Sequence, residues 1–174
     1  MDSMVAIRAI AAADDDDLRA FYAGLSDESR RTRFLGSTNG IGAGQARYFC
    51  TPDHAHREGF VALAGATARA PIRLVGHVCV EPDDGDCAEV AIAVADDAQG
   101  QGIGRALVEA AVDWARHDGY RALTATMLAI NPAIQLLLTG LALPTTSRWV
   151  GAGIVEIRID LWASRPDSGG LTAA

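Results

Sequence analysis

The segment from Glu89 to Leu107 constrains the fold more than any other part of the sequence. Its first part, residues 90–94, alternates Val and Ile with Ala, so both faces are apolar, as in a strand covered on both sides. The chain then turns through Gln-Gly-Gln-Gly-Ile-Gly at 99–104. Over residues 103–114 the apolar side chains recur at helical spacing. We therefore predict a strand, a glycine-rich turn and a helix in direct succession.

A glycine-rich turn that leads into a helix is suited to bind a phosphate group. The first N–H groups of a helix have no partner within the helix, and glycine lets the backbone approach a ligand closely. Three interpretations compete. The spacing of Gly100, Gly102 and Gly104 fits a dinucleotide fingerprint poorly, and a Walker loop needs a lysine where Arg105 stands, in a chain without any lysine. The third is a tight turn without a ligand.

The pattern Gln99-x-x-Gly102-x-Gly104, between an apolar strand and an amphipathic helix, resembles the acyl-CoA-binding motif of the GNAT family of N-acetyltransferases. The resemblance extends over roughly Val5 to Leu161. It implies an α/β (α+β) GNAT fold, with a mixed central sheet of about six to seven strands, a splayed parallel pair and about four flanking helices. It also implies acetyl-CoA (coenzyme A) as co-substrate and an amine as acceptor.

The resemblance carries over to particular residues of this chain. The pantetheine arm of the cofactor is expected to pair with the backbone of the central strand, and its pyrophosphate to lie on the 99–104 turn. Arg105 either approaches a phosphate or covers the helix surface. Asn131 is suited to cap the next helix, ahead of Pro132, and also matches a family asparagine that contacts the cofactor. The expected cofactor-binding residues are Ile92, Ala93, Val94, Gln99, Gly100, Gln101, Gly102, Ile103, Gly104, Arg105 and Asn131.

Length and composition narrow the class of protein. The chain of 174 residues suits a single N-acetyltransferase domain at 1–163, followed by a disordered tail at 164–174. A net charge of −7 argues against nucleic acid as a partner, and no apolar run is long enough for a membrane span. Three cysteines without metal spacing indicate reduced thiols and a cytoplasmic location. His54 and His56 lack a third ligand, so we predict no metal site; the chain is expected to be a monomer or homodimer.

Residues 26–34 predict a short helix whose arginines face solvent. The phrase Leu-Ser-Asp-Glu-Ser-Arg-Arg-Thr-Arg-Phe at 25–34 resembles a segment of the bacterial protein-lysine acetyltransferase branch. That resemblance makes a lysine of another protein the leading acceptor. A small amine or an aminoglycoside-type substrate is the alternative within enzymes, and a non-catalytic acyl-CoA-binding regulatory domain is the alternative from another class.

Acyl transfer to an amine needs a base that removes the amine proton, and Glu89 is the candidate general base. It begins the central strand, where the protein-acetyltransferase branch also has a glutamate. His77 on the preceding strand is a second candidate; a two-residue hairpin at Asp84-Gly85 would place it on the opposite face from Glu89, whereas a bulge would change that. Many family members carry a tyrosine acid seven residues after the asparagine, and Leu138 stands at that position here.

Overall fold

The computed structural model describes residues 4–65 and 72–162, so the tail predicted at 164–174 lies outside the described residues. The strands are β1 (Met4–Ala9), β2 (Glu58–Gly65), β3 (Arg73–Pro82), β4 (Cys87–Val94), β5 (Ala122–Leu128), β6 (Thr145–Gly151) and β7 (Ile154–Asp160). The α-helices are α1 (Asp15–Gly24), α2 (Asp27–Phe34), α3 (Ala43–Cys50), α4 (Ile103–His117) and α5 (Pro132–Thr139). Two 3₁₀ turns, η1 (Ala12–Asp14) and η2 (Asp96–Ala98), complete the described elements.

The seven strands form one sheet in the order β1-β2-β3-β4-β5-β7-β6. β4 and β5 are parallel, and the other neighbouring pairs are antiparallel. This confirms the predicted mixed sheet with a parallel pair. The described part of the chain holds five α-helices, one more than the approximate number predicted.

Local sequence explains how α2 and α5 begin and how α4 packs. Ser26 caps α2 by accepting a hydrogen bond from the Ser29 N–H at 3.2 Å. Asn131 caps α5 in the same way, with Pro132 at its first position. The inner stripe of α4 is fully or almost fully buried and consists of Ile103, Leu107, Val108, Ala111, Val112 and Ala115.

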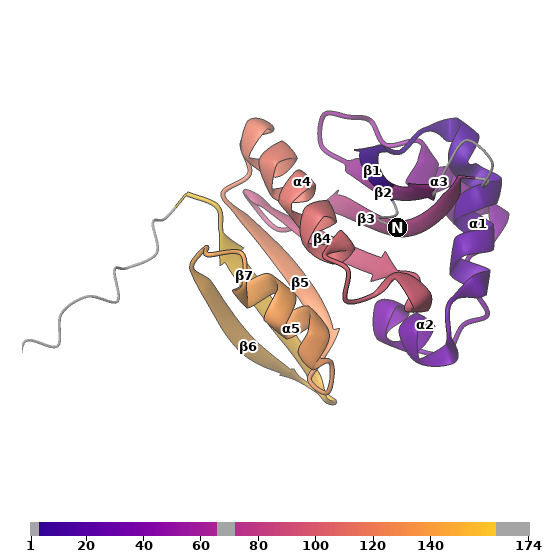
Figure 1. Cartoon of the computed structure of the whole chain (residues 1–174). Helices are drawn as coiled ribbons and strands as arrows, with labels where there is room; N and C mark the ends of the chain where they lie inside the picture. Colours follow the sequence, from indigo (N-terminus) through magenta and orange to yellow (C-terminus); the bar gives the residue numbers. More distant parts are fainter. Residues whose placement is uncertain (1–3, 66–71, 163–174) are drawn as a thin grey trace, which may run out of the picture.

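Helices cover both faces of the sheet (Figure 1). α4 crosses the face that carries Gly76 of β3, where a Cβ atom would lie only 2.8 Å from Leu107 Cδ1. The opposite face carries His77 and Cys79, and their side chains contact Tyr22 of α1 and Arg33 of α2. Glycine at position 76 thus lets α4 approach β3 closely, while α1, α2 and α3 cover the other side.

The parallel strands β4 and β5 pair only over their first residues. The paired positions are Cys87 with Ala122, Ala88 with Leu123 and Glu89 with Thr124. Beyond Glu89 the two strands diverge, as Figure 1 shows, and β4 continues to pair only with β3. No helix in the described ranges is long and apolar enough to cross a membrane.

Candidate active site

The glycine-rich turn lies directly before α4, as predicted. Gly100 and Gly102 have φ values of 73° and 81°, in the left-handed region that favours glycine. Gly102 is the N-cap residue of α4, and no side chain caps the helix there. The N–H groups of the first helical turn therefore remain without a helical or capping partner, next to the positive end of the helix dipole. Such a terminus is suited to bind a phosphate or pyrophosphate.

The side chains of this turn bond to the protein itself. The Gln99 amide donates to the Val94 carbonyl at 3.1 Å, and the Gln101 amide donates to the Asp97 carbonyl at 3.1 Å. Ile103 is 4% exposed and anchors the start of the helix in the core. These contacts fix the shape of the turn, so the groups directed to a ligand are backbone N–H groups.

Two more residues from the predicted cofactor set have partners within the protein. Arg105 Nε lies 2.8 Å from Glu109 Oε1, an exposed i,i+4 ion pair on α4. The Asn131 side chain accepts a hydrogen bond from the Ile134 N–H at 3.4 Å. Gly104 faces Leu137 of α5 and the side chains of Ile92 and Val94. The structure thus brings the 99–104 turn, the divergent part of β4 and α5 into one region.

Glu89 lies at the last paired position of β4 and β5. Its side chain is exposed, and its carboxylate accepts no hydrogen bond from any described residue. It faces a pocket of about 260 Å³ on the side of the sheet covered by α1, α2 and α3. The pocket is lined by Arg33, Phe34, Leu35, Phe49, Cys79, Glu81, Glu89, Ala91 and Thr126.

The pocket holds a second carboxylate, Glu81, opposite Glu89 in the β3–β4 register. Unlike Glu89, this carboxylate is already bonded. Arg57 Nε lies 2.9 Å from Glu81 Oε2, and the Tyr48 hydroxyl donates to the same oxygen at 2.8 Å. Glu89 is therefore the carboxylate of the two whose oxygens remain open to a substrate.

His77 lies on the same face as Glu89, so its predicted placement on the opposite face was wrong. The hairpin loop is one residue longer than a two-residue turn at Asp84-Gly85, and Pro82 pairs with Ala88. A shift of one residue moves every side chain to the other face. His77 is nevertheless fully buried, and its Nδ1 lies 2.9 Å from the Tyr22 hydroxyl.

Burial determines the ionisation of this pair. It lowers the pKa of His77 to about 3 and raises the pKa of Tyr22 to about 12, so both groups are neutral near pH 7. Because His77 has no exposed surface, it cannot take a proton directly from a substrate in the pocket. Of the two predicted bases, Glu89 is therefore the one with an exposed side chain.

The prediction that the arginines of residues 26–34 face solvent was wrong for two of them. Arg33 lines the pocket, and its guanidinium lies over the rings of Phe34 and Phe49. Arg30 bonds to the carbonyls of Ala23, Leu25 and Thr38, which ties α2 to the end of α1 and to the following loop.

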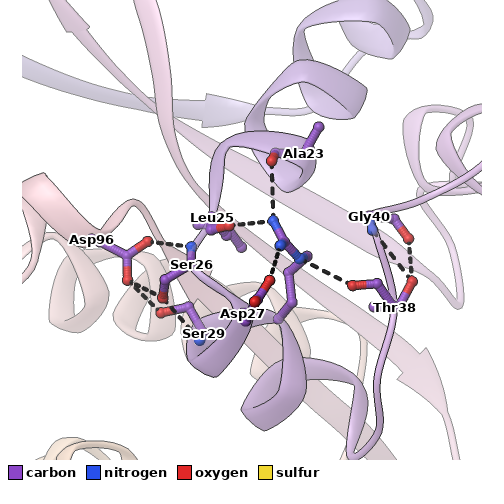
Figure 2. A network of polar contacts seen from close by, with 9 residues as sticks. Ala23, Leu25, Ser26, Asp27, Ser29, Thr38, Gly40 and Asp96 are labelled. Carbon is purple, nitrogen blue, oxygen red and sulfur yellow. Dashed lines mark hydrogen bonds and ion pairs between the residues drawn. The ribbon is translucent and has the colours of Figure 1, made fainter.

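A carboxylate network joins α2 to the segment before the glycine-rich turn (Figure 2). Asp96 accepts hydrogen bonds from the Ser26 N–H at 2.8 Å and from the Ser26 and Ser29 hydroxyls at 2.7 Å. Burial alone raises the pKa of Asp96, but these hydrogen bonds outweigh it and hold the pKa below its ordinary value. The start of α2 is thus fixed to Asp96 of η2, three residues before Gln99.

The structure brings in pocket residues that the sequence did not single out. Phe34, Phe49, Cys79 and Thr126 come from four different elements, and no local motif connects them. Only the alternation of β3 and β4 gives a signal, because Cys79, Glu81, Glu89 and Ala91 share one face once the hairpin register is known.

Leu138, at the position of the family's tyrosine, is 1% exposed and lies in the core. It brings no hydroxyl group to this region. A group of three or more His, Cys, Asp or Glu side chains able to hold a metal ion is absent from residues 4–65 and 72–162.

Comparison with known proteins identifies the family. A model of the acetyltransferase (GNAT) family matches residues 36–139 of this chain. Acetyltransferase PA5475 from Pseudomonas aeruginosa is 30% identical over 140 residues, which cover 79% of this chain and 73% of that protein. The chain therefore belongs to the GNAT acetyltransferase family, and it is an N-acetyltransferase with acetyl-CoA as co-substrate.

Solved structures agree with this fold. The GNAT domain of S. lividans PAT has a TM-score of 0.78 and 28% identity, over 88% of this chain and 89% of that chain. YncA from Salmonella typhimurium, a putative acetyltransferase solved with its cofactor acetyl-CoA, has a TM-score of 0.70 over 95% of this chain and 99% of that chain. At 18% identity, the second likeness is one of fold.

Proposed function

We propose that this enzyme transfers the acetyl group of acetyl-CoA directly to a primary amine, with Glu89 as general base. The observation that carries the proposal is the position of Glu89, where β4 and β5 cease to pair, with a carboxylate that no described residue bonds. An amine with a pKa of about 10.4 arrives mostly protonated and must lose a proton before it attacks. A carboxylate in contact with the acceptor, directly or through one water, supplies that step.

The cofactor part of the proposal uses the backbone. The pyrophosphate lies on the N–H groups of residues 100–104, and the pantetheine arm enters the gap beside Ile92, Ala93 and Val94. Support comes from the left-handed glycines, the uncapped start of α4 and the divergence of β4 from β5. The proposal also assigns cofactor contacts to Asn131, the N-cap of α5, and to Arg105 in the first turn of α4.

The proposed reaction proceeds in a ternary complex. Glu89 first takes a proton from the ammonium group, and the neutral amine nitrogen then attacks the thioester carbonyl carbon, while backbone N–H groups stabilise the oxyanion. The nitrogen releases its second proton to solvent as the tetrahedral intermediate collapses. The C–S bond then breaks, and coenzyme A leaves as a thiolate. Since a thiol has a pKa of about 8.5, the thiolate leaves without a strong acid, which fits the absence of a hydroxyl at Leu138.

We propose a lysine of another protein as the leading acceptor. The support is the resemblance of residues 25–34 to the protein-lysine branch and the 28% identity to the S. lividans PAT domain. A cytoplasmic location is proposed with it, supported by three free cysteines. A small amine is the alternative acceptor.

The test measures turnover and cofactor binding separately. Purified protein is incubated with acetyl-CoA and with small amines or lysine peptides, while the release of free thiol is followed. Glu89→Gln should lower kcat by about 10²-fold or more, with unchanged acetyl-CoA affinity by calorimetry. Glu81→Gln is the matched control, because that carboxylate is already paired with Arg57, and it should keep most of kcat.

Two outcomes contradict the proposal. Full turnover in Glu89→Gln removes the general base, and binding of acetyl-CoA without turnover on any amine indicates a regulatory acyl-CoA-binding domain.

A further inference from the structure

Arg33 places a guanidinium in the wall of the pocket that Glu89 faces, here called the acceptor pocket because the proposed base lies in it. The side chain reaches from α2 to β3, where it donates to Cys79 Sγ at 3.3 Å. Its charged carbon lies 5.0 Å from the centre of the Phe34 ring and 6.0 Å from that of Phe49. Its Nε atom is buried and has no hydrogen-bond partner in the described structure. Arginine remains charged at any physiological pH, so the pocket wall carries a positive charge.

Among residues 4–65 and 72–162 no carboxylate lies within ion-pair distance of this charge, although Glu89 across the pocket attracts it electrostatically. Glu81, the other carboxylate of the pocket, is neutralised by its ion pair with Arg57. Arg33 takes part in no such pair, and Glu89 also forms none. The pocket therefore presents one positive and one negative group, both without an ion-pair partner of their own.

A half-buried guanidinium without a bonded carboxylate can take one from a ligand. Neither Cys79 nor Tyr22 supplies negative charge near pH 7, because burial raises the pKa of both groups. Guanidinium groups bind carboxylates strongly through their N–H donors, and because Nε of Arg33 is enclosed, its terminal nitrogens are the donors available to a ligand. Glu89, in the same pocket, is the proposed base that receives the proton of the amine.

We propose that the acceptor is an amine that also carries a carboxylate, and that Arg33 binds this carboxylate while the amine faces Glu89. This inference rests on the proposed function and deepens it. The carboxylate has two sources with the same chemistry. It is either the α-carboxylate of an amino acid or an acidic side chain next to the target lysine of a peptide.

The experiment compares matched acceptors that differ only in the carboxylate. One pair is L-lysine and L-lysinamide; the other is a lysine peptide with a neighbouring Glu and the same peptide with Gln. The wild-type enzyme should prefer the carboxylate member of at least one pair by about tenfold or more in kcat/KM. The pair that shows the preference identifies the source.

Variants at position 33 separate recognition from a purely structural role. Arg33→Gln should abolish the preference by raising KM much more for the carboxylate acceptor than for the amide acceptor, with KM for acetyl-CoA unchanged. Arg33→Lys, which keeps the charge, should restore part of the preference. Arg31→Gln is the matched control, because Arg31 is exposed on the same helix, and it should behave as wild type.

Three results overturn the inference. A wild-type enzyme that accepts both members of each pair equally has no carboxylate site. Equal loss on both members in Arg33→Gln shows that Arg33 only supports the fold. No turnover on any amine overturns the proposed function and therefore also this inference. The absence of thiol release distinguishes this result from the first one, in which thiol is released with both members of each pair.

Discussion

The proposed cofactor region and the acceptor pocket are built in different ways, although they meet at Glu89. Apart from Asn131, the cofactor region is formed by one segment from β4 to the start of α4, in which left-handed glycines expose backbone N–H groups. The acceptor pocket is formed by side chains from α2, α3, β3, β4 and β5. Backbone donors recognise a phosphate that is common to all acyl-CoA molecules, whereas side chains recognise whatever acceptor fits them. The four predictions below test this division.

The largest effect on stability is expected at Leu138, a buried residue of α5. Leu138→Tyr would add the missing family hydroxyl, but the site is 1% exposed and filled. The variant should lose about 1–3 kcal/mol of stability through overpacking, without a gain in turnover. Leu136→Tyr, on the exposed side of the same helix, should stay within about 0.5 kcal/mol of wild type.

Urea unfolding and thiol-release assays on the two variants check this prediction. A gain in kcat for Leu138→Tyr would show that a tyrosine acid can work in this region, and it would contradict our account of an acid-free thiolate departure.

The buried His77 should make stability depend on pH. The folded pKa of His77 is about 3, below the value of about 6.5 in the unfolded chain. The unfolded state thus binds more protons between these values, and stability falls as the pH drops from 6.5 towards 3. From pH 7 to pH 5 this residue should cost about 2 kcal/mol.

The measurement compares the stability of wild type and His77→Gln at several pH values. The variant is expected to start less stable, because it leaves Tyr22 without its partner, but to show a shallower decline below pH 6.5. Parallel pH curves for the two proteins would rule out a buried neutral histidine.

A third prediction concerns the link between the two regions. Asp96→Ala removes the acceptor of three hydrogen bonds from the start of α2 and should cost about 1 kcal/mol. KM should rise for the amine and for acetyl-CoA together, since α2 and η2 lose their common anchor. Asp97→Ala breaks only the exposed pair with Arg73 and should cost less than about 0.5 kcal/mol. An Asp96→Ala variant with one KM unchanged would separate the two regions.

The smallest effect is expected at the rim of the cofactor region. Arg105 is held by Glu109 on the helix surface, so Arg105→Ala should weaken acetyl-CoA binding by less than about threefold. A tenfold loss of acetyl-CoA affinity, measured by calorimetry, would assign a strong phosphate contact to the Arg105 side chain. It would contradict the proposal that the pyrophosphate is bound mainly by backbone N–H groups.

The same division explains what the sequence could predict. Strand, turn and helix at 89–107 follow from local periodicity and glycine spacing, and the family resemblance supplied the parallel pair. The face of His77 was mispredicted because one extra loop residue reverses the side chains, and a hairpin signal does not fix loop length. The role of Arg33 could not be predicted, since its partners Cys79 and Phe49 lie 46 and 16 positions away in the chain.

The most direct test of the central claim is a calorimetric titration of acetyl-CoA into the wild type, Gly102→Glu and Gly119→Glu. Both glycines have positive φ and open space where a Cβ atom would lie, but Gly119 lies at the far end of α4. We predict binding by the wild type and by Gly119→Glu. Gly102→Glu should bind at least about tenfold more weakly, for two reasons. The left-handed backbone costs a residue with a side chain about 1–2 kcal/mol, which distorts the turn, and the new carboxylate repels the pyrophosphate. Equal affinity in all three proteins, or no binding by the wild type, would contradict a cofactor site built on this turn.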